Sequence, residues 1–180
     1  PAKPAVREFE LVVQRGFALT DTGKAPVPAW TYNGTVPGPE IRARQGERLR
    51  VNVVNRLDQP TTVHWHGVRV PNAMDGVPHL TQPPIAPGER FVYEFDLPDA
   101  GTFWYHSHLQ GAEQQDRGLQ GTLIVEERAK HPVHRDLTWV LDDWRTTEAG
   151  HVSETFGNPF DMAHAGRIGN TLTLNGSVKD

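Results

Sequence analysis

Two histidine pairs, each with a single intervening residue, are the residues of this sequence best suited to metal chemistry. His64 and His66 lie in "TVHWHG", and His106 and His108 lie in "GTFWYHSHLQG". In a β-strand, residues i and i+2 point to the same face, so each pair presents two imidazoles on one side of its strand. If the two strands are neighbours, all four rings converge on one small volume. Four neutral imidazoles without a thiolate suit copper, zinc, iron or nickel.

The spacing of the four histidines leaves the number of metal ions open. Adjacent imidazoles can share one ion, or they can reach two ions a few ångströms apart. The set therefore fits one mononuclear site or half of a cluster of several ions. A single pair of this kind is more often a surface or core feature than a metal site. The second pair, which is also flanked by aromatic residues, favours the metal interpretation. A zinc or iron enzyme is one alternative at this stage.

The segments around the histidines have the period-two alternation of strands. Residues 8–13, 48–55, 91–97 and 121–127 alternate in this way or form short apolar runs, and turn signals separate them at 33–39, 44–47, 86–89 and 99–101. Residues 111–118 could form one or two helical turns. Many short strands with regular turns predict an all-β fold, an antiparallel sandwich or barrel.

The pattern changes after Glu127 and predicts two domains. We expect a first domain over residues 1–128, a charged linker over 129–135, and the opening strands of a second, incomplete domain over 136–180. In the last region, Leu137, Trp139 and Leu141 alternate as in a strand, 146–170 is irregular, and "TLTLNG" begins another strand.

Composition restricts the possible partners and ligands. The 180 residues carry a net charge of −4 without a basic stripe, which argues against nucleic acid or an anionic membrane as a partner. No apolar stretch approaches the roughly 20 residues that cross a bilayer. Cysteine is absent, so metal ligands within this chain are limited to imidazole, carboxylate and backbone groups.

The motifs around the two pairs strongly resemble the first cupredoxin domain of multicopper oxidases, the group of laccases, ascorbate oxidases and copper-efflux oxidases. "YNGTVPGPEIRARQGERLRVNVVN", "HWHGVRVPNAMDGVP", "GTFWYHSH" and "GLQGTLIVEE" follow one another in the family's order. The resemblance covers residues 5–127, and more loosely the remainder, where "AGRIGNTLTLNG" resembles the start of the second domain. It implies a cupredoxin-like Greek-key β-sandwich.

The resemblance also implies a role for each matching residue. His64 corresponds to a ligand of the type 2 copper of a trinuclear cluster. His66 and His106 correspond to ligands of one type 3 copper, and His108 to a ligand of the other. Asp75, in "AMDG", corresponds to a carboxylate near the type 2 site that helps deliver protons to oxygen. The alternative for Asp75 is a turn-capping residue before the following glycine.

This sequence departs from the pattern of a whole multicopper oxidase. The family couples one-electron oxidation of a small-molecule or metal-ion reductant to four-electron reduction of O₂ to water. That chemistry needs further histidines and a Cys-His relay, whereas this chain has no cysteine and hence no type 1 copper. We expect the chain to be a fragment, a cleavage product or one piece of a split enzyme. It would be inactive without a C-terminal part that carries the remaining ligands.

Two further expectations follow from the resemblance and from imidazole chemistry. The family's exported location predicts a periplasmic or extracellular protein. Copper loading should fall at acidic pH, because only neutral imidazole binds the metal.

The main alternative to an oxidase is a non-catalytic copper-binding module for storage or delivery.

Overall fold

Strands dominate the computed structural model, which describes residues 4–19, 25–129 and 132–178. Residues 1–3 and 20–24 of the predicted first domain, 130–131 of the linker and 179–180 of the second domain lie outside the described residues. The elements are β1 (Val6–Ala18), β2 (Val27–Tyr32), β3 (Gly38–Arg44), β4 (Arg48–Asn55), β5 (His64–His66), the 3₁₀ turn η1 (Asn72–Met74), β6 (Arg90–Asp96), β7 (Gly101–His106), α1 (Gly111–Gln114), β8 (Gln120–Glu126), β9 (Leu141–Trp144), α2 (Pro159–Ala163), β10 (Thr171–Leu174) and β11 (Ser177–Val178).

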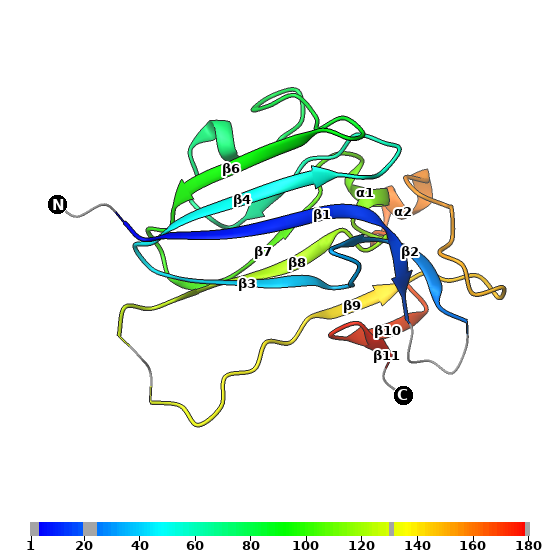
Figure 1. Cartoon of the computed structure of the whole chain (residues 1–180). Helices are drawn as coiled ribbons and strands as arrows, with labels where there is room; N and C mark the ends of the chain where they lie inside the picture. The colour runs from blue at the N-terminus through cyan, green and yellow to red at the C-terminus, as the bar shows by residue number, and fades with distance from the viewer. Residues whose placement is uncertain (1–3, 20–24, 130–131, 179–180) are drawn as a thin grey trace.

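Two four-stranded sheets face each other, in the orders β2-β1-β4-β6 and β3-β8-β7-β5 (Figure 1). The prediction of an all-β sandwich is confirmed. The expectation of purely antiparallel pairing is wrong in part, because β1 pairs in parallel with β4 and β3 in parallel with β8. Such pairs arise when long connections bring strands of different hairpins side by side, as in Greek-key folds. No helix in the described ranges has the length and apolar character of a transmembrane span.

The alternating residues of the predicted strands form the core between the sheets. Each buried branched or aromatic side chain contributes roughly 1.5–3 kcal/mol to the fold. The first sheet contributes Leu11, Val13, Leu49, Val51, Val53, Tyr93 and Phe95, and the second contributes Ile41, Trp65, Tyr105, Leu123 and Val125. The core therefore lies directly behind the two strands that carry the histidine pairs.

A third, smaller sheet is formed by β9, β10 and β11. The strand expected from residue 137 begins only at Leu141, which pairs with Leu174 of β10. Beyond that pair β10 ends in the turn at Asn175, so Leu137 and Trp139 have no ladder partner and are 62 % and 68 % exposed. The strand expected at 171 is confirmed. That residues 136–180 open a second domain stays a prediction.

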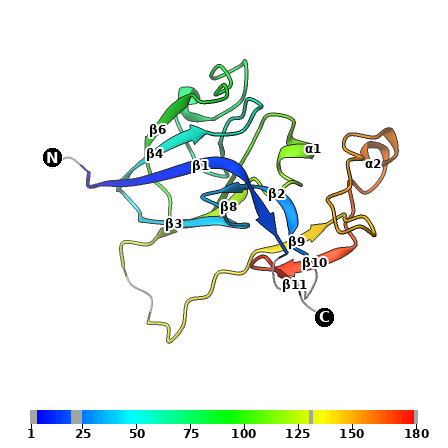
Figure 2. The same ribbon diagram turned by 45° about the vertical axis from the view of Figure 1, so that its right-hand side comes forward.

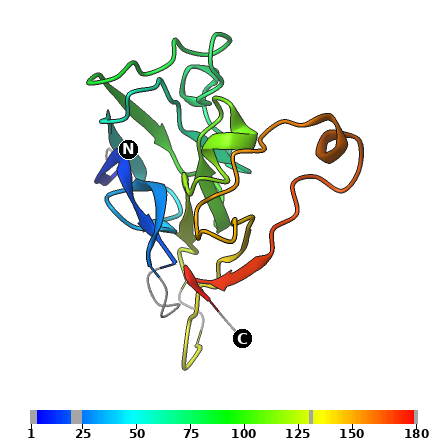
Figure 3. The same cartoon turned by 90° about the vertical axis from the view of Figure 1, so that its right-hand side faces the viewer.

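The C-terminal segment packs against one end of the sandwich. A small apolar cluster joins it to β1 and β2 and contains Ala18, Leu19, Val27, Ala29, Trp144 and Val152. In Figures 2 and 3 the loop that carries α2 stands away from the two large sheets and runs past α1, where Arg117 forms an ion pair with Glu154.

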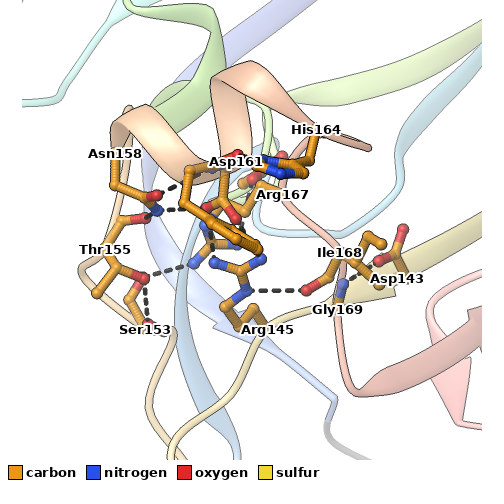
Figure 4. A network of polar contacts seen from close by, with 12 residues as sticks. Asp143, Arg145, Ser153, Thr155, Asn158, Asp161, His164, Arg167, Ile168 and Gly169 are labelled. Atoms are coloured by element: carbon orange, nitrogen blue, oxygen red, sulfur yellow. Dashed lines mark hydrogen bonds and ion pairs between the residues drawn. The ribbon is translucent and has the colours of Figure 1, made fainter.

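A network of polar contacts orders the loop around α2 (Figure 4). The two terminal guanidinium nitrogens of Arg145 donate to the carboxylate of Asp161, at 2.7 and 3.0 Å. Asn158 caps the first turn of α2, because its side-chain oxygen accepts a hydrogen bond from the backbone N–H of Asp161 at 3.0 Å. The Arg145 Nε group also donates to the carbonyl of Ile168, which closes the loop.

Replacing Asp142 by asparagine is expected to stabilise the chain at neutral pH. Burial, with the nearby charges of Asp143 and Asp116, raises the pKa of Asp142 from 3.8 to about 6. A folded-state pKa above the unfolded value gives stability that is present below about pH 4 and is lost as the pH rises through 6. The neutral amide avoids that loss, about 1–3 kcal/mol. Gln120 now donates to the Asp142 carboxylate, and after rotation of its amide it can instead accept a hydrogen bond from the asparagine Nδ2. Melting curves should show a higher Tm for Asp142→Asn at pH 7 but not at pH 4; an equal gain at both would contradict this cause.

Candidate metal centre

The pairing of β5 with β7 brings the two histidine pairs together. The register places His64 opposite His106 and His66 opposite Trp104. Between them, Trp65 and Tyr105 point into the core and are fully buried. The alternation predicted from sequence therefore holds, and the imidazoles lie on the other face of the two strands.

The four rings converge around His64. Its ring centroid lies 5.6 Å from that of His66, 5.3 Å from that of His106 and 5.2 Å from that of His108. Ring nitrogens of His64, His66 and His106 lie within 4.8 Å of one another, a spacing that allows them to hold a metal ion. His108 lies two residues beyond the end of β7, so it reaches the cluster from the following turn rather than from a strand.

Backbone carbonyls orient two of the imidazoles. The Nδ1 atom of His64 lies 2.8 Å from the carbonyl oxygen of Asp75, and Nδ1 of His106 lies 2.8 Å from that of Ser107. A carbonyl can only accept, so each Nδ1 donates its proton, and in the neutral ring the lone pair lies on Nε2. This is the arrangement in which an imidazole is prepared to bind a metal through Nε2.

The Nδ1 atom of His66 faces Nε2 of His106 at 3.3 Å. A metal–imidazole bond is about 2.0–2.1 Å long, so two nitrogens on one ion at a near-tetrahedral angle lie about 3.3–3.4 Å apart. The observed separation matches that distance. Without a metal, His66 Nδ1–H donates a hydrogen bond to His106 Nε2.

Burial keeps one member of the cluster neutral. His106 is only 5 % exposed, and this burial lowers its pKa from 6.5 to about 4, against the opposing effect of its hydrogen bond to Ser107. Trp104 stacks on one side, with its ring centroid 4.1 Å from that of His106 and 4.8 Å from that of His66. His66 and His108 are exposed, so the cluster is open on the side that these two rings form.

Asp75 contacts His64 in two ways. Besides the carbonyl contact, its carboxylate Oδ1 lies 3.3 Å from His64 Nδ1, and the side chain is 34 % exposed. Gly76, with φ +74°, allows this approach, because a Cβ atom there would collide with the carbonyl oxygen of Val63. Sequence reasoning did not single out Gly76, although a glycine directly after the aspartate was a visible signal for a tight backbone approach.

A buried polar network behind the cluster was also missed. Gln114, Ser107 and Thr61 are fully buried and hydrogen-bonded to one another. Gln114 lies in the polar stretch "GAEQQDRG", where nothing in the residue types distinguishes a buried glutamine from an exposed one.

Comparison with known proteins places this geometry in a family. The sequence model of the multicopper oxidase family matches residues 15–130. Multicopper oxidase MmcO of Mycobacterium tuberculosis is 44 % identical over 129 residues, 71 % of this chain and 25 % of that protein. Copper resistance protein A of Escherichia coli is 42 % identical over 146 residues, 80 % of this chain and 23 % of that protein. The crystal structure of a multi-copper oxidase from Pseudomonas thermotolerans has a TM-score of 0.92 at 42 % identity and covers 98 % of this chain and 42 % of that one.

The fold is the N-terminal cupredoxin domain found in copper oxidoreductases, as the sequence motifs predicted. The chain belongs to the multicopper oxidase family. It spans about a quarter of the length of the curated relatives that it matches. Membership of this family implies copper as the metal.

Proposed function

We propose that His64, His66, His106 and His108 hold one half of the trinuclear copper cluster of a multicopper oxidase. His64 would bind the type 2 copper, His66 and His106 would share one type 3 copper, and His108 would bind the other. The observation that carries this proposal is the convergence of the rings, with ligand nitrogens of three of them within 4.8 Å. The 3.3 Å separation of His66 Nδ1 and His106 Nε2 supports the shared ion.

Copper, when bound, would supply the one-electron steps by which O₂ is reduced to water. The residues of this chain supply binding and orientation. The carbonyls of Asp75 and Ser107 hold two rings at Nδ1, which leaves Nε2 of each ring available to a metal. Trp104 covers one side of His66 and His106 and excludes water there.

We propose that Asp75 holds and transfers a proton at its carboxylate Oδ1. This atom lies 3.3 Å from the His64 ring, and the partial exposure of the side chain connects it with solvent. The alternative of a turn residue has its own support, because the backbone N–H of Asp75 caps the 3₁₀ turn η1 by donating to Asn72.

The rest of the oxidase would come from a C-terminal part that supplies the remaining histidines and the type 1 copper. No thiolate exists in this chain, and His66 and His108 leave one side of the cluster open to such a partner.

We also propose the domain division at 128 and 136, a small-molecule or metal-ion reductant, and a periplasmic or extracellular location. Relatives named as a copper resistance protein and as Laccase-2 of Botryotinia fuckeliana support the type of chemistry.

Equilibrium dialysis of the chain against copper and zinc, followed by assay with a phenolic reductant, tests the proposal. We expect copper to be retained in preference to zinc. We expect no O₂ consumption by this chain alone, because the thiolate route for electrons is missing. A chain that retains zinc and rejects copper would contradict the oxidase assignment. Sustained O₂ consumption by the isolated chain would contradict the need for a C-terminal part.

A further inference from the structure

Strand pairing alone does not fix the position of all four imidazoles. β5 has three residues, and its ladder with β7 ends at the pair His64 and His106. His108 lies beyond this ladder, in the turn that leads to α1. Its position must therefore be set by contacts outside the sheet.

Gln114 makes such contacts from the end of α1. Its side chain is fully buried. Its Oε1 atom accepts hydrogen bonds from the hydroxyl of Thr61 at 2.8 Å and from that of Ser107 at 2.5 Å. Its Nε2 group donates to the carbonyl of Pro60 at 3.0 Å. One amide thus joins two segments that are far apart in the sequence.

Both segments lead directly to the histidines. Ser107 separates His106 from His108, and its carbonyl oxygen is the acceptor that orients the His106 ring. The Ser107 hydroxyl also accepts from the backbone N–H of Leu109 at 3.3 Å, on the far side of His108. Thr61 lies three residues before His64, at the start of the segment that becomes β5.

We propose that Gln114 is a positioning residue for the metal centre, which sets the separation of the two histidine pairs by bonding Thr61 and Ser107 to one oxygen. This inference rests on the proposed function, because it takes the histidines to bind copper. The hydrogen bonds that Gln114 accepts from Thr61 and Ser107 are called the clamp below. A satisfied polar network in a buried site has few alternative arrangements, because each broken bond leaves a buried group unpaired. The clamp thereby confines the turn that carries His108 without touching the metal itself.

The test compares Gln114→Met with the unchanged chain. Methionine has nearly the same length and volume as glutamine but removes the acceptor and the donor. We expect Cu(II) to bind at least about tenfold more weakly, in the range found when partners that orient metal ligands are removed. We also expect the ¹⁵N signals of the His106 and His108 rings to shift in the metal-free protein. A competition titration measures the copper affinity and NMR measures the ring signals, both well below the unfolding temperature.

A matched control separates positioning from general stability. Thr31, in β2, is also fully buried, and its hydroxyl donates to the carbonyl of Gln14 at 3.0 Å. We expect Thr31→Val to lower the Tm but to leave the copper dissociation constant and the ring signals unchanged. If Gln114→Met does not fold, Ser107→Ala, which removes one bond of the clamp, provides the same comparison.

The possible failures can be told apart. A folded Gln114→Met variant with unchanged copper affinity and unchanged ring signals would overturn the positioning role. Failure of the unchanged chain to bind copper would instead overturn the proposed function, and the ring signals of the metal-free variants would still test the clamp.

Discussion

Substituting Gly76 by alanine is expected to destabilise the chain by about 2 kcal/mol or more and to weaken copper binding with it. The residue has φ +74°, which disfavours any side chain, and an added Cβ would meet the carbonyl oxygen of Val63. The η1 loop would have to move away from β5 and take the Asp75 carbonyl from the His64 ring. Urea unfolding of the metal-free chain and a Cu(II) titration measure the two effects.

Gly88→Ala is the control for this substitution. Gly88 has a similar φ of +80°, but no atom lies within 4 Å of the position that its Cβ would occupy. It should cost only the conformational penalty, roughly 1–2 kcal/mol, and leave copper affinity unchanged. Equal effects of the two substitutions on stability and on copper binding would show that the contact with Val63 does not matter.

Replacing His106 by alanine is expected to lower the affinity for Cu(II) by at least about 100-fold, above the range typical for lost orienting partners. His106 is the buried member of the cluster, its Nε2 faces His66, and its depressed pKa keeps it neutral at pH 7. Competition titration with a chelator of known affinity measures the change, and circular dichroism verifies that the variant is folded.

His151→Ala provides the comparison for a histidine outside the cluster. His151 is exposed in the C-terminal segment. Its replacement should leave copper affinity unchanged. If His106→Ala bound copper as tightly as His151→Ala, the cluster would not be the principal site.

The convergence of the histidines was predictable because both segments that carry them show the period-two alternation of a strand. Alternation along β5 and β7 directs Trp65 and Tyr105 into the core, and this places His64, His66 and His106 on the opposite face. The sandwich followed from the same alternation in the other strands. These features depend on residue type at each position, which is what a sequence displays.

The features that could not be predicted depend on distant contacts. The strand expected from Leu137 starts at Leu141, because the end of β10 rather than local preference sets the ladder. The two parallel pairs depend on which connections cross the fold. The burial of Gln114 depends on Thr61 and Ser107 meeting it in space.

Anomalous diffraction at the copper edge, from crystals of the chain soaked in Cu(II), tests the central claim most directly. We expect the strongest copper peak among the rings of His64, His66 and His106, on the face of β5 and β7 opposite to Trp65. Strong peaks only at histidines elsewhere in the chain, with none in this cluster, would contradict the claim that the two histidine pairs form a copper centre.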